Sequence, residues 1–484
     1  MSSVVFSGGA APGRHLLAAP VRFHSLVNLP DSQLEWPGSN RPLLYELRQA
    51  GIGKHQLNKR LLTAALVGSF GGFIFGYDLG ALSASTQSLR GQWHLSPALF
   101  GLTVSSSLWG TVCGALSSGP VAGRLSRRDL IAGCSVLYAL AAIGIALPIS
   151  SSWILVPAMR FLCGMAIAGF TVACPLYLSE IAPIALRGRL VSLFQVQVGV
   201  GVLVAFSVGL VVAHLAAAGN QWKWCLGLGA VPAVLLLFLL RLSFSGNARL
   251  NSDDLPDPPS AAASRPGIGS GREKLFSRKN VRPILLATSI AIFNQLSGVN
   301  VLLLYVLDIL SSAGLGLFLG HTYTVLISST SLAMTVLGMA FVDKLGRKPL
   351  LLWGSAGMAG CLLCLGLAIP HRLGPLFYLS ILFAYHAFFA FSQGTVVWVY
   401  LSELFSPGTR GKGQGYGSSV NWIANAILIS IFPVMQHASS GRAFYFFSLT
   451  MVLQIGVVLL WYPETRGKAL GSIAAPERAG VNWP

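Results

Sequence analysis

Long apolar runs alternate with short polar segments along nearly the whole chain. A helix needs about 20 residues to cross the hydrocarbon core of a bilayer, and twelve of the runs reach that length. We therefore predict membrane-spanning helices at 61–83, 99–121, 129–149, 153–176, 190–214, 222–243, 283–311, 320–342, 349–370, 376–402, 417–436 and 443–463. This pattern is typical of an all-α membrane protein with several spans.

A polar segment rich in proline and acidic residues divides the spans into two sets of six. We expect an N-terminal tail at 1–60, a six-helix half at 61–243, a linker at 244–282, a second six-helix half at 283–463 and a C-terminal tail at 464–484. Hydrophobic residues make up 54% of the chain and charged residues only 10%, whereas soluble domains carry about a quarter charged residues. This composition argues against a soluble enzyme.

The chain also has no Gly-rich phosphate loop, cluster of metal ligands or nucleophile triad. We therefore expect no enzyme activity, no cofactor and no metal site.

Basic residues are distributed unevenly between the two sides of the predicted spans. Most of the 33 Lys and Arg residues lie in the N-terminal tail, in the linker and in the loops after even-numbered spans. Because basic loops stay on the cytoplasmic side, we expect a multi-pass protein of the cell membrane with both termini in the cytoplasm. The net charge of +18 then faces the inner leaflet of the lipid bilayer, and no nucleic-acid partner is needed to explain it.

The two sets of spans share a repeated motif. Tyr-Leu-Ser-Glu occurs at 177–180 and again at 400–403, and Arg-Gly follows at 187–188 and at 410–411. Both copies lie at the cytoplasmic end of corresponding spans, which indicates duplicated halves. Many secondary transporters are built from two such halves with a solute site between them. We therefore favour a transporter, and one that works as a monomer because a single chain supplies both halves.

Only two ionisable residues lie well inside the predicted spans, Asp78 in the first and Arg160 in the fourth. Ionisable groups at bilayer depth are costly and usually functional. A desolvated carboxylate beside an arginine can take up and release a proton as its partner moves, so the pair is a candidate for proton coupling. The alternative is a fixed ion pair that only holds two helices together. Asp308, near the outer end of the seventh span, is expected to be a solvated end charge.

Polar amides and two tryptophans form a second group of candidates. Amides offer donors and acceptors together, and indole rings stack on the C–H faces of sugars, so this mixture favours a neutral, polyhydroxylated solute. The alternative is hydrogen bonding between helices, worth about 0.6 kcal/mol for each contact. The residues are Gln195, Asn294, Gln295, Asn300, Asn421, Asn425, Trp398 and Trp422.

Acidic and basic residues alternate at the cytoplasmic ends of the spans. They are candidates for a gate that latches the halves together on the inside and breaks when that side opens. Exposed ion pairs are individually worth about 0–1 kcal/mol, so only a network would bias the conformation, and the alternative is simple anchoring at the inner leaflet. The residues are Arg127, Glu180, Arg187, Asp343, Arg347, Glu403 and Arg410.

Taken together, these motifs resemble the sugar porter family of the major facilitator superfamily over residues 61–470. The segments that carry the resemblance are Gly72–Asp78, Pro175–Gly188, Gln295–Asn300, Asp343–Lys348, Trp398–Glu403, Asn421–Trp422 and Pro463–Gly467. The resemblance implies the major facilitator fold, with twelve transmembrane helices in two pseudo-symmetric halves.

By this resemblance, sugar contacts fall at Gln195, Gln295, Asn300, Trp398 and Asn421, and Asn294 stands at the first position of the family's double Gln. Proton-coupled members carry the Asp and Arg that stand here at 78 and 160.

The sequence departs from the family in the loop after the second span, where Gly123 and Ser126 replace an Asp and a Gly. In the eighth span, Ser331 stands where many members have Asn.

We therefore predict a monosaccharide transporter, for a hexose or a pentose, that works by alternating access as a proton symporter. A facilitative sugar uniporter and a non-transporting sugar sensor are the alternatives.

Overall fold

The structure is a computed structural model, and all the secondary structure that it describes is helical. It describes residues 54–122, 125–147, 153–181, 187–215, 219–245, 275–312, 314, 316–371, 373–406, 409–438 and 441–466. The described residues from 63 onward form one compact unit. The predicted tails and linker lie largely outside the described residues, so the division into five parts stays a prediction.

Among the described residues, twelve single helices or groups of consecutive helices are long and apolar enough to cross a membrane, which confirms the predicted number of spans. The first six spans are α2 (Lys54–Trp93), α3 (Pro97–Ala122), α4 (Arg127–Ala146), α5 (Leu155–Ile181), α6 (Arg187–Leu215) and the pair α7 (Gln221–Gly227) with α8 (Ala230–Ser245).

The second six spans begin after the short helix η5 (Arg278–Asn280). They are α10 (Val281–Leu296) with α11 (Val299–Leu304) and α12 (Val306–Ser312), then α13 (Leu317–Leu345), α14 (Arg347–His371), α15 (Pro375–Phe391) with α16 (Gln393–Leu404), α17 (Arg410–Ala438) and α18 (Arg442–Trp461). We call the end where α2 ends and α3 begins the outer end, following the predicted orientation, and the opposite end the inner end.

Three spans that the sequence predicts as continuous helices are interrupted. The seventh breaks at Gly298, whose φ of 82° is left-handed, and again at Tyr305, while the tenth breaks at Ser392 and the sixth between α7 and α8. Irregular backbone at membrane depth is tolerated where protein covers it. Ser297, Tyr305 and Ser392 are accordingly buried, and the hydroxyl of Tyr385 donates to the carbonyl of Ser297 at 2.8 Å. The prediction of unbroken helices was wrong at these points.

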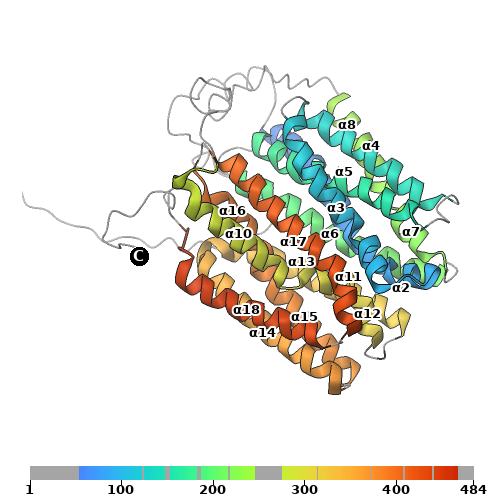
Figure 1. Ribbon diagram of the computed structural model, residues 1–484. Helices are drawn as coiled ribbons and strands as arrows, with labels where there is room; N and C mark the ends of the chain where they lie inside the picture. Colours follow the sequence, from blue (N-terminus) through green and yellow to red (C-terminus); the bar gives the residue numbers. More distant parts are fainter. Residues whose placement is uncertain are drawn as a thin grey trace, which may run out of the picture. The chain divides into compact units, whose positions relative to one another are not determined.

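Helices from the two sets pack directly against each other where α3 meets α17 and where α6 meets α13, and α2 also contacts α11 and α12. Figure 1 shows α3 and α17 side by side. Between them, the indole Nε1 of Trp109 donates to the hydroxyl of Ser430 at 3.2 Å, and that hydroxyl donates to Ser105 at 2.7 Å. Polar contacts of this kind connect helices where lipid offers no hydrogen-bond partner.

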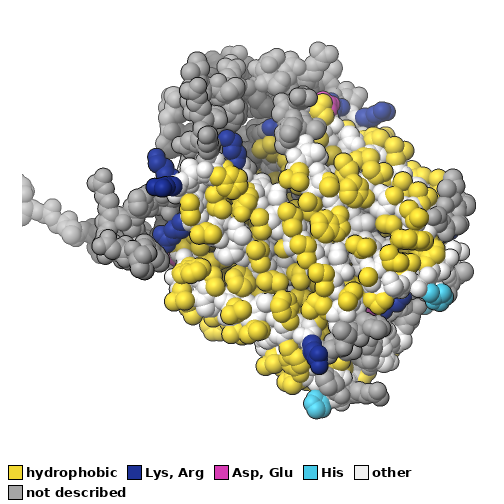
Figure 2. All heavy atoms as spheres, viewed as in Figure 1, with side chains coloured by type: hydrophobic (Ala, Val, Ile, Leu, Met, Phe, Trp, Pro, Cys, Tyr) yellow, Lys and Arg dark blue, Asp and Glu magenta, His cyan; other side chains and the backbone are white. Residues whose placement is uncertain are grey.

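The described surface matches a protein that faces lipid. Figure 2 shows a broad expanse of hydrophobic side chains, with Lys and Arg at its margins. Leu140 and Leu460 are examples of large apolar residues that remain 63% and 80% exposed. In water such an area would promote association, but in a bilayer it faces acyl chains.

Close packing of α3 on α5 depends on two glycines, one on each helix, and each faces a backbone carbonyl of the opposite helix. A methyl group added at Gly110 would collide with the carbonyl of Phe161, and one added at Gly164 would collide with the carbonyl of Ser107. Small residues of this kind let membrane helices approach closely.

We predict that Gly110→Ala lowers the thermal stability of the purified protein, because α3 and α5 must move apart. Gly133→Ala on α4 is the matched control, since nothing lies within 4 Å of the added methyl group. Alanine favours a helix by about 1 kcal/mol over glycine, so the control should keep or raise the melting temperature. Equal melting temperatures for the two variants would contradict the packing argument.

Candidate transport site

Asp78 and Arg160 meet inside the first six spans. The guanidinium Nη1 of Arg160 lies 2.5 Å from Asp78 Oδ1, and the side chains of Arg160 and Asp78 are 2% and 3% exposed. The hydroxyl of Tyr138 donates to the same carboxylate oxygen at 3.0 Å, and that of Ser107 donates to Oδ2 at 3.4 Å. The structure thus brings the two predicted residues together and adds Tyr138 and Ser107, which the sequence analysis did not single out.

Four helices meet at this carboxylate: Asp78 comes from α2, Ser107 from α3, Tyr138 from α4 and Arg160 from α5. The Nε and Nη2 atoms of Arg160 are buried and have no hydrogen-bond partner among the described residues. The arginine therefore depends on Asp78 for compensation of its charge. A change in the charge of Asp78 would affect all four helices at once.

Four of the five predicted amides of the second six spans form one hydrogen-bonded cluster. Asn300 Nδ2 donates to Gln295 Oε1 at 2.9 Å. Gln295 Nε2 donates to the side-chain oxygens of Asn294 and Asn421 at 3.1 and 3.0 Å. Three of the four are buried, and Asn300 is half-buried. The cluster lies at the break of the seventh span, where α10 ends and α11 begins.

Two further glutamines extend this cluster and were missed by the sequence analysis. Asn294 Nδ2 donates to Gln393 Oε1 at 3.5 Å, and Gln393 Nε2 donates to Gln454 Oε1 at 2.6 Å. Gln393 is the first residue of α16, directly after the break of the tenth span, and Gln454 lies on α18. Gln454 is a single polar residue in an apolar stretch, and Gln393 lies between Ser392 and Thr395 in an otherwise apolar span. A large amide among apolar residues is the only sequence signal that could have drawn attention to them.

The remaining candidates are placed less tightly. Gln195 on α6 and Trp398 on α16 are half-buried, and within the described part of the chain neither joins the amide cluster. Trp422 makes an edge contact with Phe75 of α2, with ring centroids 5.5 Å apart. Asn425 is 1% exposed, and neither of its amide atoms has a partner among the described residues. Buried amides normally have hydrogen-bond partners, so the side chain of Asn425 is suited to form hydrogen bonds with a ligand or a water molecule.

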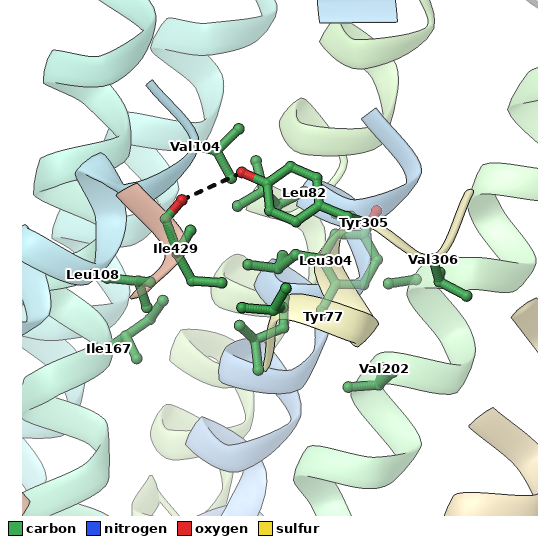
Figure 3. Packing of buried hydrophobic residues seen from close by; sticks show 14 of the residues in the cluster. Tyr77, Leu82, Val104, Leu108, Ile167, Val202, Leu304, Tyr305, Val306 and Ile429 are labelled. Atoms are coloured by element: carbon green, nitrogen blue, oxygen red, sulfur yellow. Dashed lines mark hydrogen bonds between the residues drawn. The ribbon is translucent and has the colours of Figure 1, made fainter. Parts of the chain in front are cut away.

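The outer end is closed by apolar side chains from both sets of spans. Figure 3 shows Tyr77 and Leu82 of α2 packed in one cluster with Leu304 of α11 and Val306 of α12, and a dashed line from the Tyr305 hydroxyl to the carbonyl of Ile429. That hydrogen bond is 3.4 Å long.

Polar contacts continue this closure along α2. The hydroxyl of Ser83 donates to the carbonyl of Leu303 at 2.6 Å, and Gln87 Nε2 donates to that of Leu307 at 3.0 Å. Arg90 Nη2 then lies 3.3 Å from Asp308 Oδ2.

The expectation that Asp308 is a solvated end charge was therefore wrong. Asp308 is only 6% exposed. Its partner Arg90 lies beyond the predicted first span, 61–83, but α2 continues as a helix to Trp93. The segment looks like a loop because it is polar, and it is polar because several of its side chains hydrogen-bond to the second set of spans.

At the inner end, Arg347 joins two acidic residues of the second set of spans. Its Nη2 atom donates to Glu403 Oε1 at 2.9 Å, while Thr465 donates to Glu403 Oε2 at 2.6 Å. The backbone N–H groups of Arg347 and Lys348 donate to Glu464 at 3.0 and 2.9 Å, so Glu464 caps the start of α14.

The part of the predicted gate that would join the two halves is not tested. Arg127 is half-buried at the start of α4. The side chains of Glu180, Arg187, Asp343 and Arg410 lie outside the described residues.

Partial burial alone would raise the pKa of Glu464, but the backbone N–H groups of Arg347, Arg466, Lys348 and Thr465 outweigh it and hold the pKa below its usual value. These donors stabilise the carboxylate form.

The twelve helical spans, the lipid-facing surface and the buried polar groups define a membrane transporter rather than an enzyme. The profile of the family described as "Sugar (and other) transporter" matches residues 64–243 and 262–475. The chain belongs to this family, the sugar porters of the major facilitator superfamily.

Several relatives are similar over most of the chain. The "Glucose transporter GlcP" of Staphylococcus epidermidis is 31% identical over 430 residues, which cover 84% of this chain and 95% of the relative. The "D-xylose-proton symporter" of Escherichia coli is 28% identical over 468 residues, covering 86% and 95% of the two chains. The crystal structure titled "D-xylose-proton symporter" superposes with a TM-score of 0.73 at 27% identity, over 84% of this chain and 99% of that chain.

We predict that Arg90→Met increases opening of the outer end, because it leaves the carboxylate of Asp308 buried without its cation. Arg90 is 46% exposed, so the pair should contribute at most about 1 kcal/mol, or up to about fivefold in the open population. The measurement is labelling of Leu82→Cys, a residue only 2% exposed, by a membrane-impermeant thiol reagent.

Adding Asp308→Asn to Arg90→Met is the control for this pair. The double variant should label less than Arg90→Met alone, because no buried charge is left unpaired. If the single and double variants label at equal rates, the pair does not hold the outer end closed.

We predict that the start of α14 loosens as Glu464 is protonated. A lowered pKa in the folded protein means that stabilisation is fully present above the usual glutamate value, about 4.3, and is lost as the pH falls through the lower folded value. Hydrogen exchange of the amides of Arg347 and Lys348 should therefore accelerate several-fold in Glu464→Gln at pH 7. Exchange at the wild-type rate would show that the carboxylate does not cap this helix.

Proposed function

We propose that this protein carries a monosaccharide, a hexose or a pentose, across the cell membrane by alternating access and in symport with a proton. The observation that carries the coupling is the buried contact between Asp78 and Arg160, with carboxylate and guanidinium 2.5 Å apart. Such a charge pair inside a membrane is costly, and here it connects four helices.

The solute site is formed by the amide cluster of Asn294, Gln295, Asn300 and Asn421, together with the half-buried Gln195 and Trp398. These groups carry no net charge, and amides pair well with hydroxyl groups because both donate and accept. Asn425 adds a buried amide that has no partner among the described residues. The names of two relatives, a glucose transporter and a D-xylose-proton symporter, support a monosaccharide as the solute.

In the proposed cycle, Asp78 takes up a proton when the outer end is open. The neutral carboxyl no longer compensates Arg160, and the contact that holds α2 to α5 weakens. The two halves then rock so that the outer end closes and the sugar and the proton leave at the inner end. A buried acid that changes charge can bias two conformations only if its environment differs between them, and movement of α2 relative to Arg160 supplies that difference.

The orientation and assembly follow the charge distribution and the chain itself. Both termini lie in the cytoplasm, because most of the basic residues are in the tails, the linker and the loops on that side. The protein acts as a monomer in the lipid bilayer, since one chain provides both the charge pair and the amide cluster. The proton is the coupling ion, and no other cofactor takes part.

We predict that Asp78→Asn abolishes accumulation of labelled sugar above equilibrium while leaving equilibrative exchange. The measurement is uptake of a panel of hexoses and pentoses by cells without their own sugar carriers, with and without a protonophore. Wild-type uptake should collapse to equilibrium when the protonophore is added. Asp129→Asn is the matched control, because Asp129 is an exposed carboxylate at the start of α4.

Loss of folding must be separated from loss of coupling in this experiment. Removing one partner of a buried pair costs about 3–5 kcal/mol, so Asp78→Asn is also combined with Arg160→Gln to leave no unpaired charge. Surface expression and size-exclusion profiles accompany each uptake curve. Equilibrating wild-type uptake that ignores the protonophore would make the protein a uniporter, and no uptake of any sugar would argue against transport of this class.

A further inference from the structure

The amides of the second six spans are arranged as a chain in which every member donates in the same direction. Asn300 donates to Gln295, Gln295 to Asn294, Asn294 to Gln393, and Gln393 to Gln454. The chain begins at α11, passes through α10 and α16 and ends on α18. Its far end is the most deeply buried part, since Gln393 and Gln454 are both 0% exposed.

The orientation of Gln393 is held by two acceptors on α18. Its Nε2 atom lies 2.6 Å from Gln454 Oε1 and 3.6 Å from the sulfur of Met451. With the amino group held there, the carbonyl oxygen of Gln393 points toward Asn294 and accepts from it. A primary amide has its donors and its acceptor at opposite ends, so holding one amide in a chain determines the direction of the next.

This direction decides what Gln295 can offer to a ligand. Both hydrogens of its Nε2 atom are used, one on Asn294 and one on Asn421. Its Oε1 atom accepts one bond, from Asn300, and a carbonyl oxygen can accept two. Gln295 can therefore only accept from a ligand, and a ligand hydroxyl that meets it must act as a donor.

We propose that Gln393 and Gln454 are positioning residues that set the substrate specificity of the transport site. They fix the orientation of the amide of Gln295. This orientation determines which sugar hydroxyls must donate a hydrogen bond. Neither needs to touch the sugar. This inference rests on the proposed function, because it concerns the same site.

The experiment compares analogues of the transported sugar that lack one hydroxyl or replace it with fluorine. Fluorine cannot donate a hydrogen bond, so at the hydroxyl that meets Gln295 both analogues should compete poorly for uptake by the wild type. In Gln454→Leu the nearer acceptor for Gln393 is lost, only the weak acceptor Met451 remains, and the amides of the chain can turn. Gln295 can then donate a hydrogen bond to the fluorine. The apparent affinity for the fluoro analogue should therefore rise about fivefold relative to that for the deoxy analogue, which corresponds to one hydrogen bond.

Three further variants make the result specific. Gln454→Glu keeps an acceptor oxygen for Gln393 and should keep the wild-type pattern. Gln454→Met replaces the amide oxygen with a thioether, which accepts only weakly, and repeats the test with an unbranched side chain should Gln454→Leu fail to fold. Ser448→Ala removes a buried hydrogen bond from the same helix, to the carbonyl of Ala359 at 2.9 Å, and should leave the pattern unchanged because Ser448 is outside the chain of amides.

The outcomes separate this inference from the proposed function. A change in the fluoro-to-deoxy ratio, expressed in KM rather than kcat, supports positioning by Gln454. Unchanged ratios in folded Gln454→Leu and Gln454→Met would overturn it, even if both variants transport more slowly. If the wild type takes up no sugar of the panel, the proposed function is wrong, and this inference is overturned with it.

Discussion

The rest of the structure depends on how one carboxylate inside the first six spans is compensated. Asp78 is almost completely buried, and so is Arg160, its partner across the contact from α2 to α5. Separating two buried charges leaves each uncompensated in a medium where that is expensive. The hydroxyls of Tyr138 and Ser107 complete the site, and this one group thereby fixes the positions of α2, α3, α4 and α5 relative to each other.

The two sets of spans use different chemistry, although their motifs repeat. The first set buries a charge pair, while the second buries neutral amides that hydrogen-bond to each other. A neutral network tolerates exchange of one partner for a solute hydroxyl, because the number of hydrogen bonds is kept. A charge pair responds to a proton instead. In the proposed symport cycle, this separation would let the first half sense the proton while the second half supplies most of the contacts to the solute, and coupling would require movement between the halves.

The features that the sequence predicted correctly are the number of spans and the grouping of the few polar residues that lie in apolar surroundings. Twelve apolar runs were enough for the number of spans, and Asp78 and Arg160 could be paired because no other charges lie well inside them. The grouping of Gln295, Asn300 and Asn421 also followed from their polarity. Hydropathy does not mark the breaks at Gly298 and Ser392, because apolar residues continue on both sides of each break. Gln393 and Gln454 escaped notice because an isolated buried amide looks the same whether it joins a network or only two helices.

The length of α2 explains how the charge pair can act on the closed outer end. The helix runs without interruption from Lys54 to Trp93, and after Asp78 it carries Ser83, Gln87 and Arg90 at helical spacing on one face. These three contact α11 and α12 of the second set of spans. A rigid helix that moves at Asp78 must also move at these contacts, which lie about one to three turns farther along. In the proposed cycle, the polar segment that looks like a loop in the sequence is therefore the part of α2 that would transmit the state of the charge pair to the opposite half.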